Sequence, residues 1–392
     1  MSRYAAIYFF IFVALGAYVP WMPPWLVERG LTEGQVAGAL AAVAVMRALL
    51  PAAWGWLADR VGGSHRLFPL ASVLAAGVLC LLMLPLPVPL VVAVLGLYGM
   101  FWVPLVPFAE TLTLSALGDQ PHRYGEVRWW GSLGFVVATL GVGFVFERWS
   151  AALALVPLLV AGPYFVTGIL GLGLPRGTPR GAGTQEATEA RLPWRPILAL
   201  ALVAALGQST HGPYYAFFSL RLKDLGVGPT TISALWVLGV LAEILVMTRS
   251  AQWIPKLGLS RALRWALALT ALRWTIFAST DNLIVISLVQ LLHAASFGLM
   301  HLTVVQWVDR LSPPGRRAVG QGLLSSVTYG LGVGGGLALS GAAVGVLGHH
   351  GLFAAGAVTA GIGWVLSFGL SPAPQAASID PPIHDPPSAP GR

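Results

Sequence analysis

The stretch TTISALWVLGVLAEILVMTRSAQWI, residues Thr230–Ile254, decides the fold. At about 1.5 Å per residue, it is long enough to cross the roughly 30 Å hydrocarbon core of a bilayer as a helix. Glu243 lies near its middle. A charge at that depth costs at least about 2.5–3.5 kcal/mol, and such groups face a bundle interior or a water-filled cavity. The stretch therefore predicts a membrane helix with a paired or functional carboxylate.

Similar apolar runs repeat along nearly the whole chain of 392 residues. Of these residues 56% are hydrophobic and only 10% are charged, whereas soluble proteins average about 25% charged residues. The net charge of +8 does not indicate a nucleic-acid partner, because the basic residues lie in short segments between apolar runs and set membrane topology. The single cysteine, Cys80, excludes an internal disulfide and a cysteine metal site.

We expect an all-α membrane protein with twelve transmembrane helices in two pseudo-symmetric six-helix bundles. The first apolar run is too long for a signal peptide and lacks a cleavage pattern, so it is interpreted as a span. The expected spans are 4–26, 35–58, 67–85, 88–116, 127–147, 150–174, 194–219, 230–254, 260–279, 283–308, 318–346 and 351–370.

Composition also predicts the domain boundaries. A polar segment rich in Gly and Pro, 175–193, separates an N-terminal bundle, 1–174, from a C-terminal bundle, 194–371. The end of the chain, 372–392, is rich in Pro, Ala and Asp and is expected to be disordered.

The distribution of Lys and Arg predicts the orientation. With both termini in the cytoplasm, seventeen of these residues fall in cytoplasmic segments and four in outside segments, which is a strong positive-inside signal. We therefore expect a multi-pass protein of the bacterial inner membrane.

The two halves match one another when one is shifted by 196 residues. Gly16 then falls on Gly212, and further matches recur at the ends of the first two spans of each half. Parallel six-span repeats are typical of secondary transporters, whose substrate site lies between the repeats. The same shift places Arg47 on Glu243, so the halves carry opposite charges at equivalent depth.

The segment Gly55-Trp-Leu-Ala-Asp59-Arg60-Val-Gly-Gly-Ser-His-Arg66 follows the second span. It resembles the loop signature of the major facilitator superfamily, in which a carboxylate meets a helix N-terminus and neighbouring arginines in a tight turn. The resemblance implies that Asp59, Arg60 and Arg66 gate the cytoplasmic side by latching the two halves together. The alternative is a set of solvated loop charges.

The segment Arg123-Tyr-Gly-Glu-Val-Arg128-Trp-Trp-Gly-Ser, preceded by Glu110, is more specific. It resembles the phenylpropionate permease family and the related lactose permease-type proton symporters. In the lactose permease an acid and an arginine eighteen residues later bind substrate, and Glu110 and Arg128 have that spacing. The alternative is an ion pair that steadies the fourth and fifth spans.

The second half resembles the same proteins. The matching residues are His211, Tyr214 and Tyr215 in one motif, Glu243, Arg273, and His293, Ser296 and His301 in another. The resemblance implies that Glu243 contacts substrate, and that Arg273 and His293 take part in proton coupling. Ser296 replaces the acid that carries the proton in the lactose permease.

Glu243 is the candidate proton carrier here. A carboxyl that alternates between an apolar surrounding and a nearby arginine would bind and release a proton. His293 and His301 are second choices, since an unperturbed His titrates near pH 6.5 and the two lie about two turns apart on one helix face. For each the alternative is a hydrogen-bonded interior histidine. Tyr214 and Tyr215, beside His211, are candidates for binding an aromatic substrate.

These patterns predict a proton-coupled symporter that works by alternating access. Arg47, Arg128 and Arg273 lie in apolar spans and favour an anionic substrate, and the resemblance suggests an aromatic carboxylate such as 3-phenylpropionate. The alternatives are an importer of a neutral sugar or nucleoside and a non-transporting membrane sensor. No enzyme activity, cofactor or metal is expected. The expected partners are a small-molecule substrate, a proton and the lipid bilayer, with no nucleic acid, and the protein is expected to be a monomer.

Overall fold

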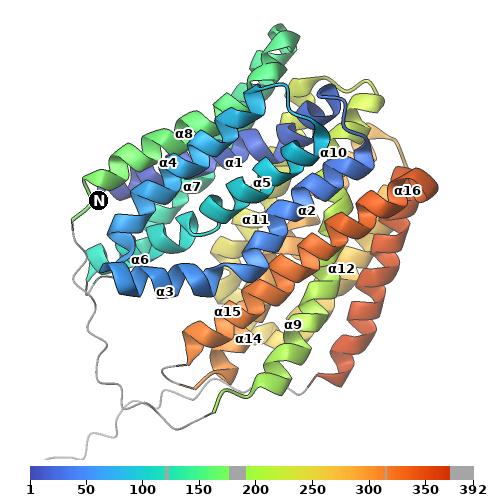
Figure 1. Ribbon diagram of the computed structural model, residues 1–392. Coiled ribbons are helices and arrows are strands. Elements are labelled where there is room, and N and C mark those ends of the chain that lie inside the picture. Colours follow the sequence, from blue (N-terminus) through green and yellow to red (C-terminus); the bar gives the residue numbers. More distant parts are fainter. Residues whose placement is uncertain (119, 121–122, 176–190, 314–315, 371–392) are drawn as a thin grey trace, which may run out of the picture.

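The computed structural model describes residues 1–118, 120, 123–175, 191–313 and 316–370, and this part of the chain forms helices and no strand (Figure 1). The helices of the first half are α1 (Ser2–Glu28), α2 (Glu33–Leu49), α3 (Pro51–Val61), α4 (Ser64–Cys80), η1 (Leu81–Met83), α5 (Val88–Trp102), α6 (Leu105–Leu117), α7 (Tyr124–Arg148), η3 (Ser150–Leu155) and α8 (Val156–Leu172).

The helices of the second half follow from residue 194. They are α9 (Trp194–Ser209), α10 (His211–Asp224), α11 (Pro229–Leu257), α12 (Leu259–Ser279), α13 (Leu283–Gln290), the π-helix η4 (Ala294–Leu299), α14 (Met300–Leu311), α15 (Arg317–Ser325), the π-helix η5 (Ser326–Val333), α16 (Gly334–Leu366) and η6 (Ser367–Gly369).

Within the described ranges, eight helical segments are long and apolar enough to cross a membrane, or nine when α2 and α3, bent by 53°, count as one span. Three more spans complete the predicted twelve. One is α9 with α10, one is the arginine-rich α12, and one arises because α16 contains two helices that meet at Gly348. The fold class expected from the sequence is confirmed.

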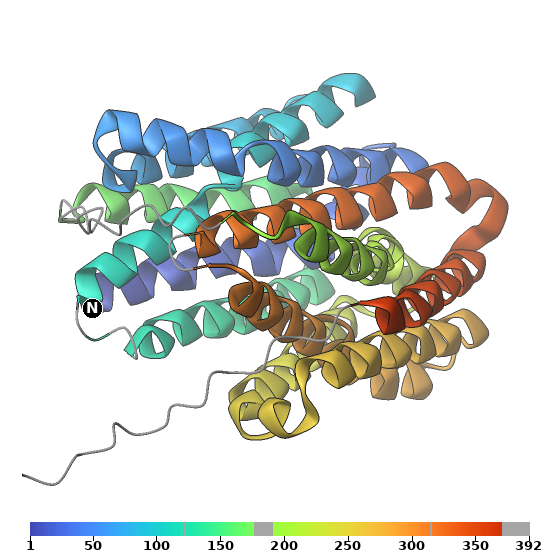
Figure 2. The same ribbon diagram turned by 90° about the horizontal axis from the view of Figure 1, so that it is seen from below.

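Gly348 makes the turn between the last two spans. Its φ of 60° and ψ of −178° belong to a region that residues with a Cβ essentially do not adopt. The chain therefore reverses direction at this turn, as the orange and red ribbons of Figure 2 show, and both runs of α16 contact α9 and α10.

The packing follows the two-bundle arrangement. In the first half α1 packs on α7 and α8, and α4 packs on α8; in the second half α12 packs on α16, and α9 on η5. The halves meet where α2 packs on η5 and α16, where α7 packs on α11, and where α1 packs on α10. One hydrophobic core spans the first half and part of the second, and a smaller core lies within the second half, so the seam between the bundles crosses the larger core.

Glycines bring the seam together at the end of the molecule that is distant from the linker, which we call the far end. A Cβ on Gly34 would lie 2.7 Å from the carbonyl oxygen of Gly341, and one on Gly143 would lie 2.2 Å from Ser233 Oγ. Small residues permit such close helix approach in membranes. The opposite end, where α3, α6 and α15 lie, we call the linker end.

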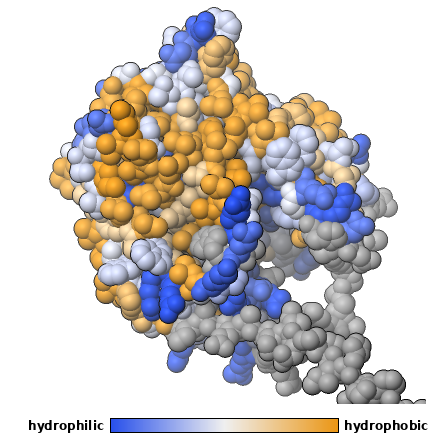
Figure 3. Space-filling model, turned by 180° about the vertical axis from the view of Figure 1, so that it is seen from behind, coloured by the Kyte–Doolittle hydropathy of each residue, from blue (hydrophilic) through white to orange (hydrophobic). Residues whose placement is uncertain are grey.

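The outer surface is apolar over a wide area. Large hydrophobic side chains are exposed on it, such as Leu339 and Val346, and Figure 3 shows hydrophobic residues over most of one face, with hydrophilic residues gathered toward its lower side and at its top. This is the surface expected of a protein in a bilayer. The predicted linker and tail fall largely on 176–190 and 371–392, outside the described residues, so the domain boundaries stay predictions.

Candidate functional site

A buried arginine lies at the centre of the second half. Arg273 on α12 is fully buried. Its Nη1 donates to Ser296 Oγ at 2.9 Å and to His293 Nδ1 at 3.2 Å, and its Nη2 donates to Gln290 Oε1 at 2.9 Å. The guanidinium also lies over the rings of Tyr214, at 4.6 Å, and Trp274, at 4.2 Å. Hydrogen bonds and aromatic faces together replace the water that the charge has lost.

His293 connects this arginine to Glu243. Its Nε2 lies 3.6 Å from Glu243 Oε2, and the Glu243 side chain is 16% exposed. A guanidinium can only donate, so Nδ1 of His293 accepts and the proton of a neutral imidazole lies on Nε2, facing Glu243. The resulting row of Glu243, His293 and Arg273 crosses from α11 through the break before η4 to α12.

Aromatic rings surround the row. His211, at the start of α10, approaches Ser296 Oγ at 3.3 Å and stacks near Tyr215, with ring centres 6.0 Å apart. Tyr214 accepts from Gln290 Nε2 at 3.0 Å and lies 4.6 Å from the ring of Trp236. These contacts fix the α10 residues against α11, α12 and α13.

The first half presents a second polar group. Tyr124 donates to Glu110 Oε1 at 3.2 Å, and the hydroxyls of Tyr8 and Tyr124 lie 3.3 Å apart. Arg128 lies over the rings of Phe12, at 4.2 Å, and Tyr8, at 5.6 Å. Although both residues are described, no ion pair joins Glu110 to Arg128, so the pairing weighed from the sequence is not formed. Arg128 acts electrostatically on Glu110 and, across the seam, on Glu243.

Arg47 on α2 also reaches across the seam. Its guanidinium lies 4.9 Å from the ring of Tyr329 on η5, and its charge acts on His301 of α14. His301 is hydrogen-bonded to Tyr329, and its ring stacks on Phe297, which stacks on His293. The two histidines therefore share one face, as the spacing predicted.

The Arg47 side chain is exposed, although the ring of Tyr329 beside it is buried. Arg128 and Glu243 are partly exposed as well. We call the region where Arg47, Arg128, Glu243 and Tyr329 act on one another across the seam the central cavity. It brings together the predicted residues of both halves.

The predicted gating residues lie elsewhere. Arg60 is placed over its neighbour Trp56, at 4.1 Å, and Arg66 donates to Val61 O at 2.8 Å. In the described part of the chain, neither these arginines nor Asp59 forms a hydrogen bond or ion pair with the second half. The latch between the halves stays a prediction.

Sequence reasoning missed several residues of the site. Tyr8, Phe12 and Tyr329 contact the arginines of the cavity, and Gln290 holds Arg273. Aromatic residues are common in apolar spans, so nothing local set the first three apart. Gln290 carried a signal, because an amide in an apolar span requires a buried partner.

In the chain as described, one group of histidine and carboxylate side chains is close enough to share a metal ion, and it lies at the far end rather than in the cavity. The cavity itself offers arginines, carboxylates, histidines and aromatic rings. That set suits binding of a small organic molecule and movement of a proton, and it has no nucleophile held against a base.

Known proteins share this sequence and fold. The profile of the MFS_1-like family matches residues 1–355. The maltose permease of Geobacillus stearothermophilus is 29% identical over 343 residues, covering 83% of each chain. The probable 3-phenylpropionic acid transporter of Escherichia coli K12 is 28% identical over 322 residues, covering 78% of this chain and 82% of that one. Among solved structures, a variant of the nucleoside transporter NupG superposes with a TM-score of 0.79 at 16% identity, covering 94% of this chain and 98% of that one.

The match to the family covers most of the chain, and the relatives are membrane transporters rather than enzymes. With the helices and cavity described above, this makes the protein a multi-pass secondary transporter of small molecules, and it belongs to the MFS_1-like family.

Proposed function

We propose that the protein is a proton-coupled symporter of an aromatic carboxylate, of which 3-phenylpropionate is the first candidate. It acts by alternating access, as a monomer in the bacterial inner membrane with both termini in the cytoplasm. The distribution of Lys and Arg supports this orientation. In this orientation the far end faces outside and the linker end faces the cytoplasm.

The main observation in support of the proposed substrate is the surroundings of two arginines. Arg47 and Arg128 line the central cavity, and their contacts in the described residues are with aromatic rings. A cation that lies on ring faces retains its N–H donors for a bound carboxylate, which binds a guanidinium in two parallel hydrogen bonds. The rings of Phe12, Tyr8 and Tyr329 beside these charges suit an aromatic substrate.

The row of Glu243, His293 and Arg273 supports proton coupling. Glu243 is partly accessible from the cavity, and Arg128 acts on it from the other half. A substrate carboxylate bound to Arg128 would weaken that attraction and favour protonation of Glu243. Substrate and proton would therefore bind together, which is what symport requires.

A neutral sugar is the second candidate, because the maltose permease relative is as similar as the phenylpropionate one. Glu110 with its tyrosine partners would then bind sugar hydroxyls. Under this alternative Arg47 and Arg128 would shape the cavity without contacting a substrate charge.

Uptake into proteoliposomes with an imposed proton gradient tests the proposal, with 3-phenylpropionate, maltose and a nucleoside compared side by side. We expect uptake of the acid, and its loss when an ionophore collapses the gradient. Uptake of maltose or the nucleoside without uptake of the acid would overturn the proposed substrate. Uptake of the acid that is insensitive to the ionophore would overturn proton coupling.

A further inference from the structure

At the far end, three side chains from both halves of the molecule converge. Glu33 at the start of α2, Asp224 at the end of α10 and His349 after the Gly348 turn offer ligand atoms that all lie within 4.8 Å of one another. His349 Nε2 is 3.0 Å from Glu33 Oε1. The convergence thus joins the first half to the second across the seam.

Among the described residues, neither carboxylate has a lysine or arginine partner, and His349 is the basic side chain beside them. In the described part of the chain no Lys or Arg forms an ion pair with Glu33 or Asp224, and Asp224 accepts no hydrogen bond; the adjacent Lys223 binds Glu28 at 3.1 Å instead. Two carboxylates at this separation repel one another unless a cation lies between them. The arrangement leaves that cation to be supplied.

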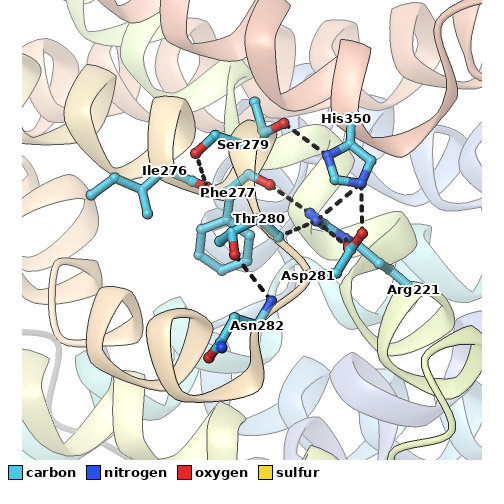
Figure 4. A network of polar contacts seen from close by, with 9 residues as sticks. Arg221, Ile276, Phe277, Ser279, Thr280, Asp281, Asn282 and His350 are labelled. Atoms are coloured by element: carbon cyan, nitrogen blue, oxygen red, sulfur yellow. Dashed lines mark hydrogen bonds and ion pairs between the residues drawn. The ribbon is translucent and has the colours of Figure 1, made fainter.

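The histidine is held in place. Its ring stacks on the buried Phe217, with ring centres 5.5 Å apart. The neighbouring His350 lies on the other side of the turn, where it contacts Asp281 Oδ2 at 3.1 Å and Ala278 O at 2.8 Å (Figure 4). Arg221 completes that network, and its Nη2 donates to Asp281 Oδ1 at 2.7 Å. A turn anchored on one side directs His349 toward the acids on the other.

We propose that Glu33, Asp224 and His349 form a binding site for a divalent transition-metal ion of the zinc class. One imidazole nitrogen and two carboxylate oxygens are ligands that zinc accepts at about 2.0–2.2 Å, with a remaining position for water. Ligand atoms bound to one zinc ion lie closer together than 4.8 Å, so the three side chains must rotate slightly toward one another to bind it. Magnesium and calcium prefer oxygen ligands alone, so the imidazole selects against them.

Occupancy of this site depends on the state of the transporter. Glu33 belongs to the first half, and the other two ligands belong to the second. Opening of the far end would move Glu33 away and break the site. A bound ion therefore stabilises the state in which the far end is closed and, in the alternating-access cycle of the proposed function, on which this step rests, it slows transport.

Zinc binding to the purified full-length protein in detergent, measured by isothermal titration calorimetry with ZnCl₂, tests the site without any transported substrate. We expect one ion with a Kd of about 10 µM or tighter, an increase of the melting temperature on addition of ZnCl₂, and neither effect with MgCl₂. His349→Ala and Asp224→Asn should each weaken binding by at least about tenfold, since even outer-shell partners of a metal contribute that much.

The matched control is His65→Ala at the linker end, which should bind zinc as the unaltered protein does. Asp224 is exposed, so Asp224→Asn should fold and still tests the zinc site if His349→Ala does not fold. Absence of binding overturns the site, and so does binding that persists in both ligand variants. Because the assay needs no substrate, such a failure leaves the proposed function untouched.

Discussion

Two arginines of the cavity region, Arg273 and Arg128, differ in what surrounds them. Arg273 is fully buried and donates to Ser296, Gln290 and His293. Arg128 is partly exposed and lies over two aromatic rings. The guanidinium of Arg273 is bound by protein acceptors, whereas the guanidinium of Arg128 retains N–H donors that a substrate can use. A place within an apolar span therefore does not imply an equal role, and we assign Arg273 to positioning and Arg128 to substrate binding.

Removal of Arg273 should have the largest effect. Arg273→Ala leaves Gln290, Ser296 and His293 without their shared donor and opens a cavity, so we expect a loss of about 3–5 kcal/mol of stability. The melting temperature of the purified protein should decrease by about 5 °C or more. Arg261 is exposed on the same helix, so Arg261→Ala is the control and should leave the melting temperature unchanged. Equal melting temperatures for both variants would break the assignment of Arg273.

Removal of Arg128 should affect transport and spare the fold. Arg128→Gln deletes a charge that donates to the substrate carboxylate, and such bonds are worth about 1.5–3 kcal/mol, so KM for 3-phenylpropionate should increase at least tenfold. Arg47→Gln should act in the same direction. Arg148→Gln serves as the control, because Arg148 lies over Phe144 on the same helix at 5.2 Å but outside the cavity. An unchanged KM in both cavity variants would remove the distinction drawn here.

Replacement of Glu243 should separate transport from proton coupling. Glu243→Gln retains the size and hydrogen-bonding capacity of the side chain but cannot exchange a proton. We expect exchange of substrate between equal pools to continue, while accumulation driven by a proton gradient stops. Both are measured in the same proteoliposomes with labelled substrate. Intact gradient-driven accumulation would show that another group carries the proton.

The smallest effect is expected at Asp281, in the loop between α12 and α13. A hydrogen bond from Arg221 lowers the pKa of Asp281 below its ordinary value of 3.8. The folded state therefore binds this proton less readily than the unfolded state, and the stabilisation is present above about pH 4 and lost as the pH decreases through the folded-state pKa. Melting temperatures of the unaltered protein and Asp281→Asn should differ at pH 7 and converge near pH 3. A constant difference across that range would contradict the ionic role.

The fold was predictable in most respects. Most of the twelve spans follow from hydropathy, and the turn between the last two was placed correctly because Gly348 and its histidines interrupt an apolar run. The site was predictable as a set of residues, since ionisable groups inside spans are costly and rarely lie there without a role. The contacts among those residues were not predictable. The sequence left an ion pair between Glu110 and Arg128 as an alternative, whereas in the structure Glu110 accepts a hydrogen bond from Tyr124.

The sequence by itself determined that the chain crosses a membrane, where its spans lie, and which charges lie inside them. These properties depend on how each segment transfers from water to lipid, and that transfer is local. Tertiary structure decided which charges have protein partners and which are available to a substrate, because those partners lie on other helices that pack against the same face. Arg273 meets Gln290 and Ser296, Arg47 meets Tyr329, and Glu33 meets His349 only after residues distant in the chain have packed together.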